Sequence, residues 1–200
     1  TIEFRDVDLE NYDLTLVDEA EANRIAENIR ERVLDDFTRN GRFIANGKEE
    51  IAPALDELGE HKSVLVELGK ALEPYDLHFG YRVLDEVALF FANAREAQEA
   101  GIIEFESDDA ILDAAVLMKV LPKIHGSRQR LEEPLTRILC WALKEKTVHG
   151  RIEDVLQRIG GENAQRSDIP LLLERWETNS ESFTYPETAK KVLRMLYALY

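Results

Sequence analysis

One stretch near the middle of the sequence, Phe79-Gly80-Tyr81-Arg82, has residue types that suit the binding of an anion. Apolar residues at helical spacing follow it, so a helix is predicted to begin at Gly80 with Arg82 in its first turn. The helix dipole favours acids at that end, which makes an arginine unusual there. The unpaired N–H groups of a helix start suit a phosphate, and Arg82 would add a positive charge. From the residues alone, an ion pair with Asp85 or Glu86, three and four residues on, is the stronger interpretation.

A second stretch, around residues 121–131, is basic. Four cations and one histidine fall within twelve residues, with no acid among them: Lys119, Lys123, His125, Arg128 and Arg130. This basic segment could contact nucleic acid, a nucleotide or an acidic neighbouring subunit. The alternative is a helix C-terminus whose cations satisfy the dipole, followed by a short loop. The sequence favours neither.

Other kinds of chemistry find little support in the sequence. The single cysteine, Cys140, lies in an apolar run and is predicted to be a buried thiol. The segment Gly41 to Lys48 resembles a phosphate-binding loop only superficially, because Asn46 stands where glycine is needed and Glu49 follows the lysine. No serine nucleophile motif or cysteine–histidine pair at a known spacing is present. A zinc site is not predicted, since no two histidines have i,i+4 spacing: His61, His78, His125 and His149.

Composition limits the class of protein. The 200 residues are 44% hydrophobic and carry a net charge of −15, with no run of the roughly 18 apolar residues that a membrane helix needs. Residues 1–100 hold 11 basic against 24 acidic side chains, a net of −13, whereas residues 101–200 hold 14 against 16, a net of −2. Phosphate would be repelled by most of this surface, which disfavours nucleic-acid binding by the whole chain. A cytoplasmic protein without a membrane segment is expected.

The pattern of apolar residues predicts an all-α chain with a short N-terminal strand or extended segment at residues 1–8. A break can occur at Gly59 or Gly69, and residues 178–184 are predicted to be a polar linker. No capping residue ends the last helix, and the first strand lacks a partner, so the chain is expected to be a fragment of a longer protein. Helices are predicted at 18–39, 53–72, 80–100, 107–121, 131–142, 152–159, 170–176 and 186–200.

Four stretches taken together resemble the C-terminal part of McrB-type AAA+ proteins, the nucleotide-driven motor subunits of modified-DNA restriction systems. Each is only moderately specific, and it is their shared order along nearly the whole chain that carries the resemblance. The stretches are Thr1 to Tyr12 (TIEFRDVDLENY), Phe79 to Glu86 (FGYRVLDE), Val120 to Leu131 (VLPKIHGSRQRL) and Tyr185 to Leu196 (YPETAKKVLRML).

The resemblance implies a division into three parts. Residues 1–16 would be the end of the AAA+ nucleotide domain or a leading segment, 17–105 a lid-like helical domain, and 106–200 an accessory helical extension. Arg82 would be the sensor 2 arginine that reaches the terminal phosphate, while Gly80 and Tyr81 let the backbone approach the nucleotide. Positioning and charge stabilisation of this kind dominate phosphoryl transfer.

The same resemblance implies ATP or GTP with Mg in the parent protein. Walker A, Walker B and sensor 1 motifs are absent from this sequence, so tight nucleotide binding or hydrolysis by this chain alone is not expected. The implied partners are the chain's own N-terminal nucleotide domain, neighbouring protomers of a ring oligomer, and additionally a nuclease subunit and DNA at the basic segment.

Two other functions stay open at this point. The chain could be a stand-alone all-helical interaction module that docks through the basic segment. It could also be a small helical DNA-binding protein, which the net charge of −15 disfavours unless the cations gather on one surface.

Overall fold

The computed structural model describes residues 48–145 and 150–199, and within these residues the chain is all-helical, which confirms the predicted fold class. The predictions for the segments at 1–8 and 18–39 and for the loop that begins at Gly41 fall outside the described residues. No helix in the described part is long and apolar enough to cross a membrane.

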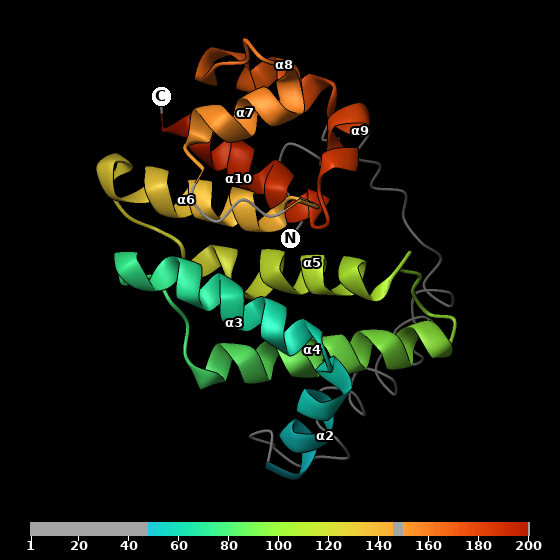
Figure 1. Ribbon diagram of the computed structural model, residues 1–200. Coiled ribbons are helices and arrows are strands. Elements are labelled where there is room, and N and C mark those ends of the chain that lie inside the picture. The colour runs from blue at the N-terminus through green and yellow to red at the C-terminus, as the bar shows by residue number, and fades with distance from the viewer. Residues whose placement is uncertain (1–47, 146–149, 200) are drawn as a thin grey trace, which may run out of the picture. The chain divides into compact units, whose positions relative to one another are not determined.

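The helices are joined by turns and by longer connections, such as the one between α4 and α5 (Figure 1). The described residues also contain four single turns of 3-10 helix, which lie between α-helices: η2 (Glu73–Tyr75), η3 (Leu121–Lys123), η4 (Arg166–Asp168) and η5 (Ser180–Ser182). The α-helices are α2 (Lys48–Leu58), α3 (His61–Leu72), α4 (Tyr81–Glu99), α5 (Asp108–Lys119), α6 (Arg128–Ala142), α7 (Ile152–Gly160), α8 (Ile169–Glu174), α9 (Trp176–Asn179) and α10 (Pro186–Ala198).

Local sequence signals account for several helix ends. Gly59 separates α2 from α3 in a left-handed conformation (φ +54°) that glycine adopts without strain, so the expected break falls there and not at Gly69. Ser107 caps α5, its Oγ accepting the Ala110 N–H at 3.3 Å, and Asp108 and Asp109 form an acidic first turn. Pro186 begins α10, as predicted, at a position where its missing N–H costs nothing.

Other local predictions were wrong. Pro53 lies inside α2 and not in its first turn, because the helix begins five residues earlier. Asp168 was expected to cap the next helix, but its carboxylate accepts the N–H of Gln165, three residues back, at 2.8 Å. Residues 178–184 do not form a linker. They hold the end of α9 and the η5 turn, where Ser180 donates a hydrogen bond to the Glu177 carbonyl. A local hydrogen bond of this kind lets a polar run stay helical.

The core gathers around α10, which packs against α5, α6 and α8. The end of α6 is tied to the approach of α10 by an isolated antiparallel bridge between Leu143 and Phe183. Trp141, on α6, is 5% exposed and so more deeply buried than the partial burial that the sequence predicts, and its ring stacks on Tyr185 with centroids 4.3 Å apart. This stack holds the N-cap of α10 against α6.

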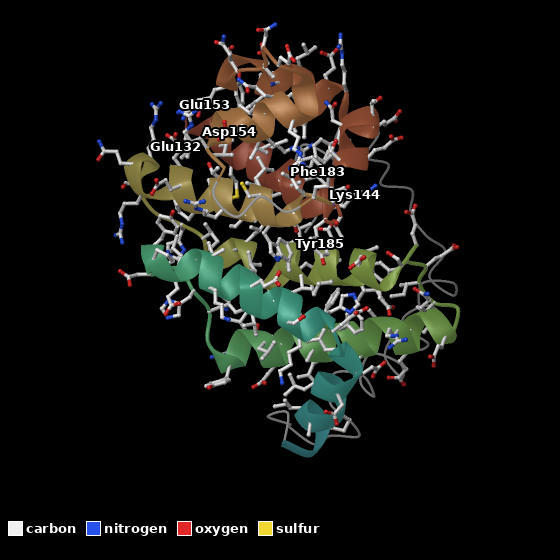
Figure 2. All side chains as sticks on the ribbon, in the orientation of Figure 1. Glu132, Lys144, Glu153, Asp154, Phe183 and Tyr185 are labelled. Carbon is white, nitrogen blue, oxygen red and sulfur yellow. The ribbon has the colours of Figure 1, made fainter. Side chains whose placement is uncertain are left out.

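A cluster of charged side chains joins η4 to α6 and α7. Arg166, in η4, pairs with Glu132 of α6 at 2.6 Å and with Glu153 of α7 at 2.8 Å. Figure 2 shows Glu132 and Glu153 on the same side of the molecule, with Asp154 close by. Asp154 accepts the N–H of Arg151 and so caps α7. These contacts hold α7 against α6.

Residues 51–200 form one compact unit. Within it α5 packs against α4 on one side and α10 on the other, so helices before and after residue 105 share a core. The division of the chain at residues 16 and 105 stays a prediction.

Candidate functional site

Arg82 lies in the first turn of α4, as the sequence predicts. Gly80 occupies the N-cap position in an extended conformation (φ −90°, ψ −174°) and offers no side chain to cap the first N–H groups. No acidic residue lies in the first turn either. The start of α4 therefore keeps the full positive end of the helix dipole, with a guanidinium beside it.

The guanidinium of Arg82 is almost fully in solvent, with its side chain 90% exposed. Its Nε contacts Glu86 Oε1 at 3.1 Å, which is the i,i+4 ion pair that the residues alone favour. An exposed pair of this kind contributes only about 0.3–0.5 kcal/mol. The pair engages Nε, so it orients the side chain while the terminal nitrogens face the solvent. The ion pair and an anion-binding role are therefore compatible.

Beside this helix start lies an apolar hollow of about 360 Å³ between α3 and α4. Phe79 forms one wall, with its ring over Gly69: a Cβ at Gly69 would lie 3.7 Å from Cζ of that ring. Tyr81 stands at the rim and is 88% exposed. The remaining lining includes Leu65, Val66, Lys70, Glu73, His78, Gly80 and Leu84. Gly80 and Tyr81 are thus brought together with α3, and Arg82 lies at the next position along the chain.

The basic segment spans three elements. Lys119 ends α5, Lys123 ends η3, and His125 lies in the turn that follows. Arg128 and Arg130 lie in the first turn of α6, which begins three residues earlier than predicted. The dipole of α6 disfavours cations there, so the interpretation as a helix C-terminus accounts for Lys119 but not for the two arginines. Lys123, His125, Arg128 and Arg130 are exposed, and Lys119 is half-buried.

A polar network inside the unit was missed by the sequence analysis. Asp113 is 2% exposed on α5, and its carboxylate accepts the N–H groups of Glu187 at 2.7 Å and Thr188 at 2.8 Å. Asp113 thus caps the first turn of α10 from another helix. Burial raises the pKa of this carboxyl, although hydrogen bonds from Thr188 and Glu187 act in the opposite direction. The signal in the sequence is an acid within the apolar run 111–116.

The network continues one turn earlier on α5. Asp109 Oδ1 accepts the Tyr185 hydroxyl at 3.3 Å and lies 3.3 Å from Nε2 of His61 on α3. The indole N–H of Trp141 donates to the Val64 carbonyl at 3.1 Å. Without these bonds, polar groups inside the core would lack hydrogen-bond partners. The bonds also link α3, α5, α6 and α10.

A larger hollow of about 720 Å³ opens where α5 and α10 begin. We call it the acidic groove, because four carboxylates and one lysine line it together with apolar walls. Figure 2 shows Lys144, Phe183 and Tyr185 in this part of the molecule. The lining residues are Phe105, Glu106, Ser107, Asp109, Ala110, Asp113, Ala114, Leu117, Lys144, Phe183, Thr184, Pro186 and Glu187.

Cys140 is buried and free, as the sequence predicts, and burial raises the pKa of its thiol. Across the described residues, no group of three His, Cys, Asp or Glu side chains is placed to hold a metal ion.

The fold and these surfaces define an all-helical domain with an exposed arginine at one helix start and two surfaces of opposite charge. The chain belongs to the family described as a domain of unknown function, DUF8727, whose model matches residues 31–200. No curated protein and no solved structure matches the sequence.

Proposed function

We propose that this chain is the lid and helical extension of an AAA+ NTPase that resembles the McrB-type motor subunits, and that Arg82 contacts the terminal phosphate of the nucleotide. The observation that carries the proposal is the start of α4. This helix start combines a glycine N-cap, a first turn without acids and an arginine whose side chain is 90% exposed. Such a helix start attracts an anion through its N–H groups and its dipole.

Gly80 and Arg82 have distinct tasks in this proposal. A Cβ at Gly80 would meet nothing within 4 Å, so the backbone is open to a ligand from outside. Arg82 supplies charge to the terminal phosphate, and Glu86 orients the guanidinium through Nε. ATP or GTP with Mg would be held mainly by the parent's nucleotide domain, where the metal neutralises phosphate charge. The described residues contribute one cation and one helix end, which matches an auxiliary role.

The proposal is tested first on the coding sequence upstream of Thr1. Walker A and Walker B motifs within the preceding ~250 residues, about the length of one α/β domain, would supply the missing nucleotide site. In that parent protein, Arg82→Ala is expected to reduce NTP turnover strongly and leave the fold intact, with Arg82→Lys intermediate. Lys70→Ala, at the rim of the same hollow, is the matched control. Turnover that is unchanged in Arg82→Ala would remove the phosphate role.

A second candidate function is a stand-alone interaction module, and the exposed apolar hollow beside α4 favours it. Tyr81 at 88% exposure and Val66 at 43% place apolar surface in contact with water. Surfaces of this kind often mark binding sites. A start codon close to Thr1 would favour this candidate, and Tyr81→Ser would then weaken binding of the partner without affecting any nucleotide.

A further inference from the structure

The connection between α4 and α5 carries apolar side chains up to the edge of the acidic groove. Ile102 and Ile103 lie in this connection and are 74% and 40% exposed. Phe105, two residues after Ile103, is half-buried and forms part of the groove wall. Figure 1 shows the connection between the end of α4 and the beginning of α5. We call Ile102 and Ile103 the isoleucine rim, because they place apolar surface in water beside a hollow, which is typical of binding sites.

The backbone of this connection is held by hydrogen bonds to α4. The N–H of Ile102 donates to the Ala97 carbonyl at 2.9 Å, and the N–H of Phe105 donates to Oε1 of Gln98 at 3.0 Å. Gly101 ends the helix in a left-handed conformation (φ +68°), which glycine adopts without strain. A partner that binds here meets a backbone that is already ordered, so the entropic cost of binding is small.

The groove holds more negative charge than its own residues neutralise. Of the charged residues that line it, four are acids and one, Lys144, is a base. The carboxylates of Asp109 and Asp113 accept hydrogen bonds from within the unit. Glu106 and Glu187 are exposed, and among the described residues neither side chain forms an ion pair. A cation from outside would therefore find two exposed carboxylates beside apolar walls.

A peptide segment suits the two surfaces better than a small ion does. Lysine and arginine bury their methylene stems against apolar walls, here Phe105 and Leu117, and keep the charged head near polar groups. A small cation would fill the groove and leave the isoleucine rim in water. Since four residues of chain reach at most about 14 Å, the rim and Glu106 are close enough for one short segment to cover both.

From this arrangement we propose that the acidic groove and the isoleucine rim form a docking site for a segment of another protein that carries aliphatic residues and, about four positions away, lysine or arginine. The aliphatic residues cover the rim, and the cations enter the groove beside Glu106 and Glu187. Apolar burial supplies affinity, and the carboxylates select a basic segment.

This docking site is separate from the two sites already described. The start of α4, where Arg82 lies, is about 28 Å from the other end of that 19-residue helix, where the connection begins. The basic segment begins at Lys119, the last residue of α5, whereas the groove lies at the beginning of α5. The proposal therefore does not depend on the nucleotide role of Arg82.

The test is fluorescence anisotropy of labelled synthetic peptides with the full chain, without nucleotide, at about 0.15 M salt. The probe peptide has three leucines, two serines and three lysines in this order. In one matched peptide glutamates replace the lysines, and in another serines replace the leucines. The wild type should bind the probe at least about tenfold more tightly than either matched peptide, and raising the salt to about 0.6 M should weaken the binding.

Two pairs of substitutions separate the groove from the rim. Glu106→Lys with Glu187→Lys should weaken binding of the probe about tenfold or more, and this groove variant should instead prefer the glutamate peptide. Ile102→Ser with Ile103→Ser should weaken binding about fivefold or more without changing the preference for lysine over glutamate.

Matched controls lie on another part of the unit. Glu162→Lys with Glu174→Lys makes the same change in net charge beside α7 and on α8, and both glutamates are exposed. Leu171→Ser removes an apolar side chain of α8 that is 44% exposed. Neither control should alter binding. Circular dichroism checks folding, and Glu106→Lys alone replaces the double groove variant if the latter does not fold.

Several outcomes would overturn the proposal. A wild-type chain that binds none of the peptides, or all of them equally, has no such docking site. If the rim variant binds like the wild type and free spermidine displaces the probe, the groove takes a small organic cation instead. If the probe does not bind and the groove variant lowers only the unfolding temperature, another segment of the same chain covers the groove. If the wild type sediments as a dimer that the groove variant dissociates, a second copy covers it.

Discussion

Asp113 and Thr188 are joined by two hydrogen bonds, and Thr188 is the donor in both. The carboxylate of Asp113 accepts the Thr188 N–H at 2.8 Å, and the Thr188 hydroxyl donates to the Asp113 carbonyl at 3.3 Å. Both residues are buried and lie 75 positions apart in the sequence. The pair therefore fixes the start of α10 on the middle of α5.

Removing the cap should destabilise the whole unit. Asp113→Ala leaves the buried N–H of Thr188 and the part-buried N–H of Glu187 without an acceptor, and loss of such a cap costs about 1–3 kcal/mol. Thr188→Val, which removes only the hydroxyl bond, is expected to cost less. Urea unfolding followed by circular dichroism measures both. Glu106→Gln, an exposed acid on the preceding segment, is the control and should change the free energy of unfolding by less than about 0.5 kcal/mol.

The raised pKa of Asp113 predicts an unusual pH dependence. Because burial holds the folded pKa above the unfolded one, the folded state keeps the proton over a pH range in which the unfolded state has lost it. The stabilising contribution is full below the unfolded pKa and is lost as pH rises through the folded value. The stability of the wild type relative to Asp113→Asn should therefore decline from about pH 4 upward, the usual pKa of an aspartate. A relative stability that instead grows with pH would show a lowered pKa.

Arg82 should matter little for stability. Its ion pair with Glu86 is exposed on the arginine side, so Arg82→Ala is expected to change the free energy of unfolding by less than about 0.5 kcal/mol. Glu86→Gln should give the same small change. Thermal unfolding of both variants separates this result from the loss of NTP turnover that the proposed function predicts. A destabilisation above about 2 kcal/mol would mean that Arg82 has a structural role.

Gly160, at the end of α7, has no room for a side chain. A Cβ there would lie 2.8 Å from both the Ala164 Cβ and the Leu172 Cδ2. Leu172 can turn away, but Ala164 cannot, so Gly160→Ala should cost about 1–3 kcal/mol through overpacking. Gly126→Ala is the matched control, because its nearest contact would be an ordinary 3.6 Å. Equal unfolding midpoints for the two variants would contradict this close packing around Gly160.

Cys140 should report on opening of the core. Its thiol is buried and its raised pKa keeps it protonated, whereas the thiolate is the reactive form. Labelling by a thiol reagent at neutral pH should be far slower in the native chain than in urea. Asp113→Ala should accelerate native labelling, since it lowers the free energy of opening. Rapid labelling of the native wild type would show that the thiol is accessible without unfolding.

Local signals in the sequence were enough for most helix boundaries. Gly59, Ser107 and Pro186 each act through their own backbone or side chain within a few residues, so their effect can be predicted without knowing the fold. Arg82 belongs to the same group, because its position in the first turn of α4 depends only on the helix start.

Long-range partners could not be found in this way. Asp113 stands out as an acid in an apolar run, but nothing local shows that its donors lie on α10. Asp168 has the right type and position for an N-cap, yet its side chain turns back to Gln165, which competes for the same carboxylate. The acidic groove likewise joins residues near 105, 144 and 185, which only the packing of α5 against α10 brings together.

The cap of α10 also orders events during synthesis. Asp113 is made long before its donors, because Glu187 and Thr188 emerge 74 and 75 residues later. Until then the carboxylate on α5 has no donors from α10 and is expected to stay in water, so the face of α5 that it shares with Val116 stays open. The first helices can form on the growing chain, but the shared core is completed only after α10 arrives. A ribosome that pauses before residue 188 would hold a half-folded domain with its central apolar face open.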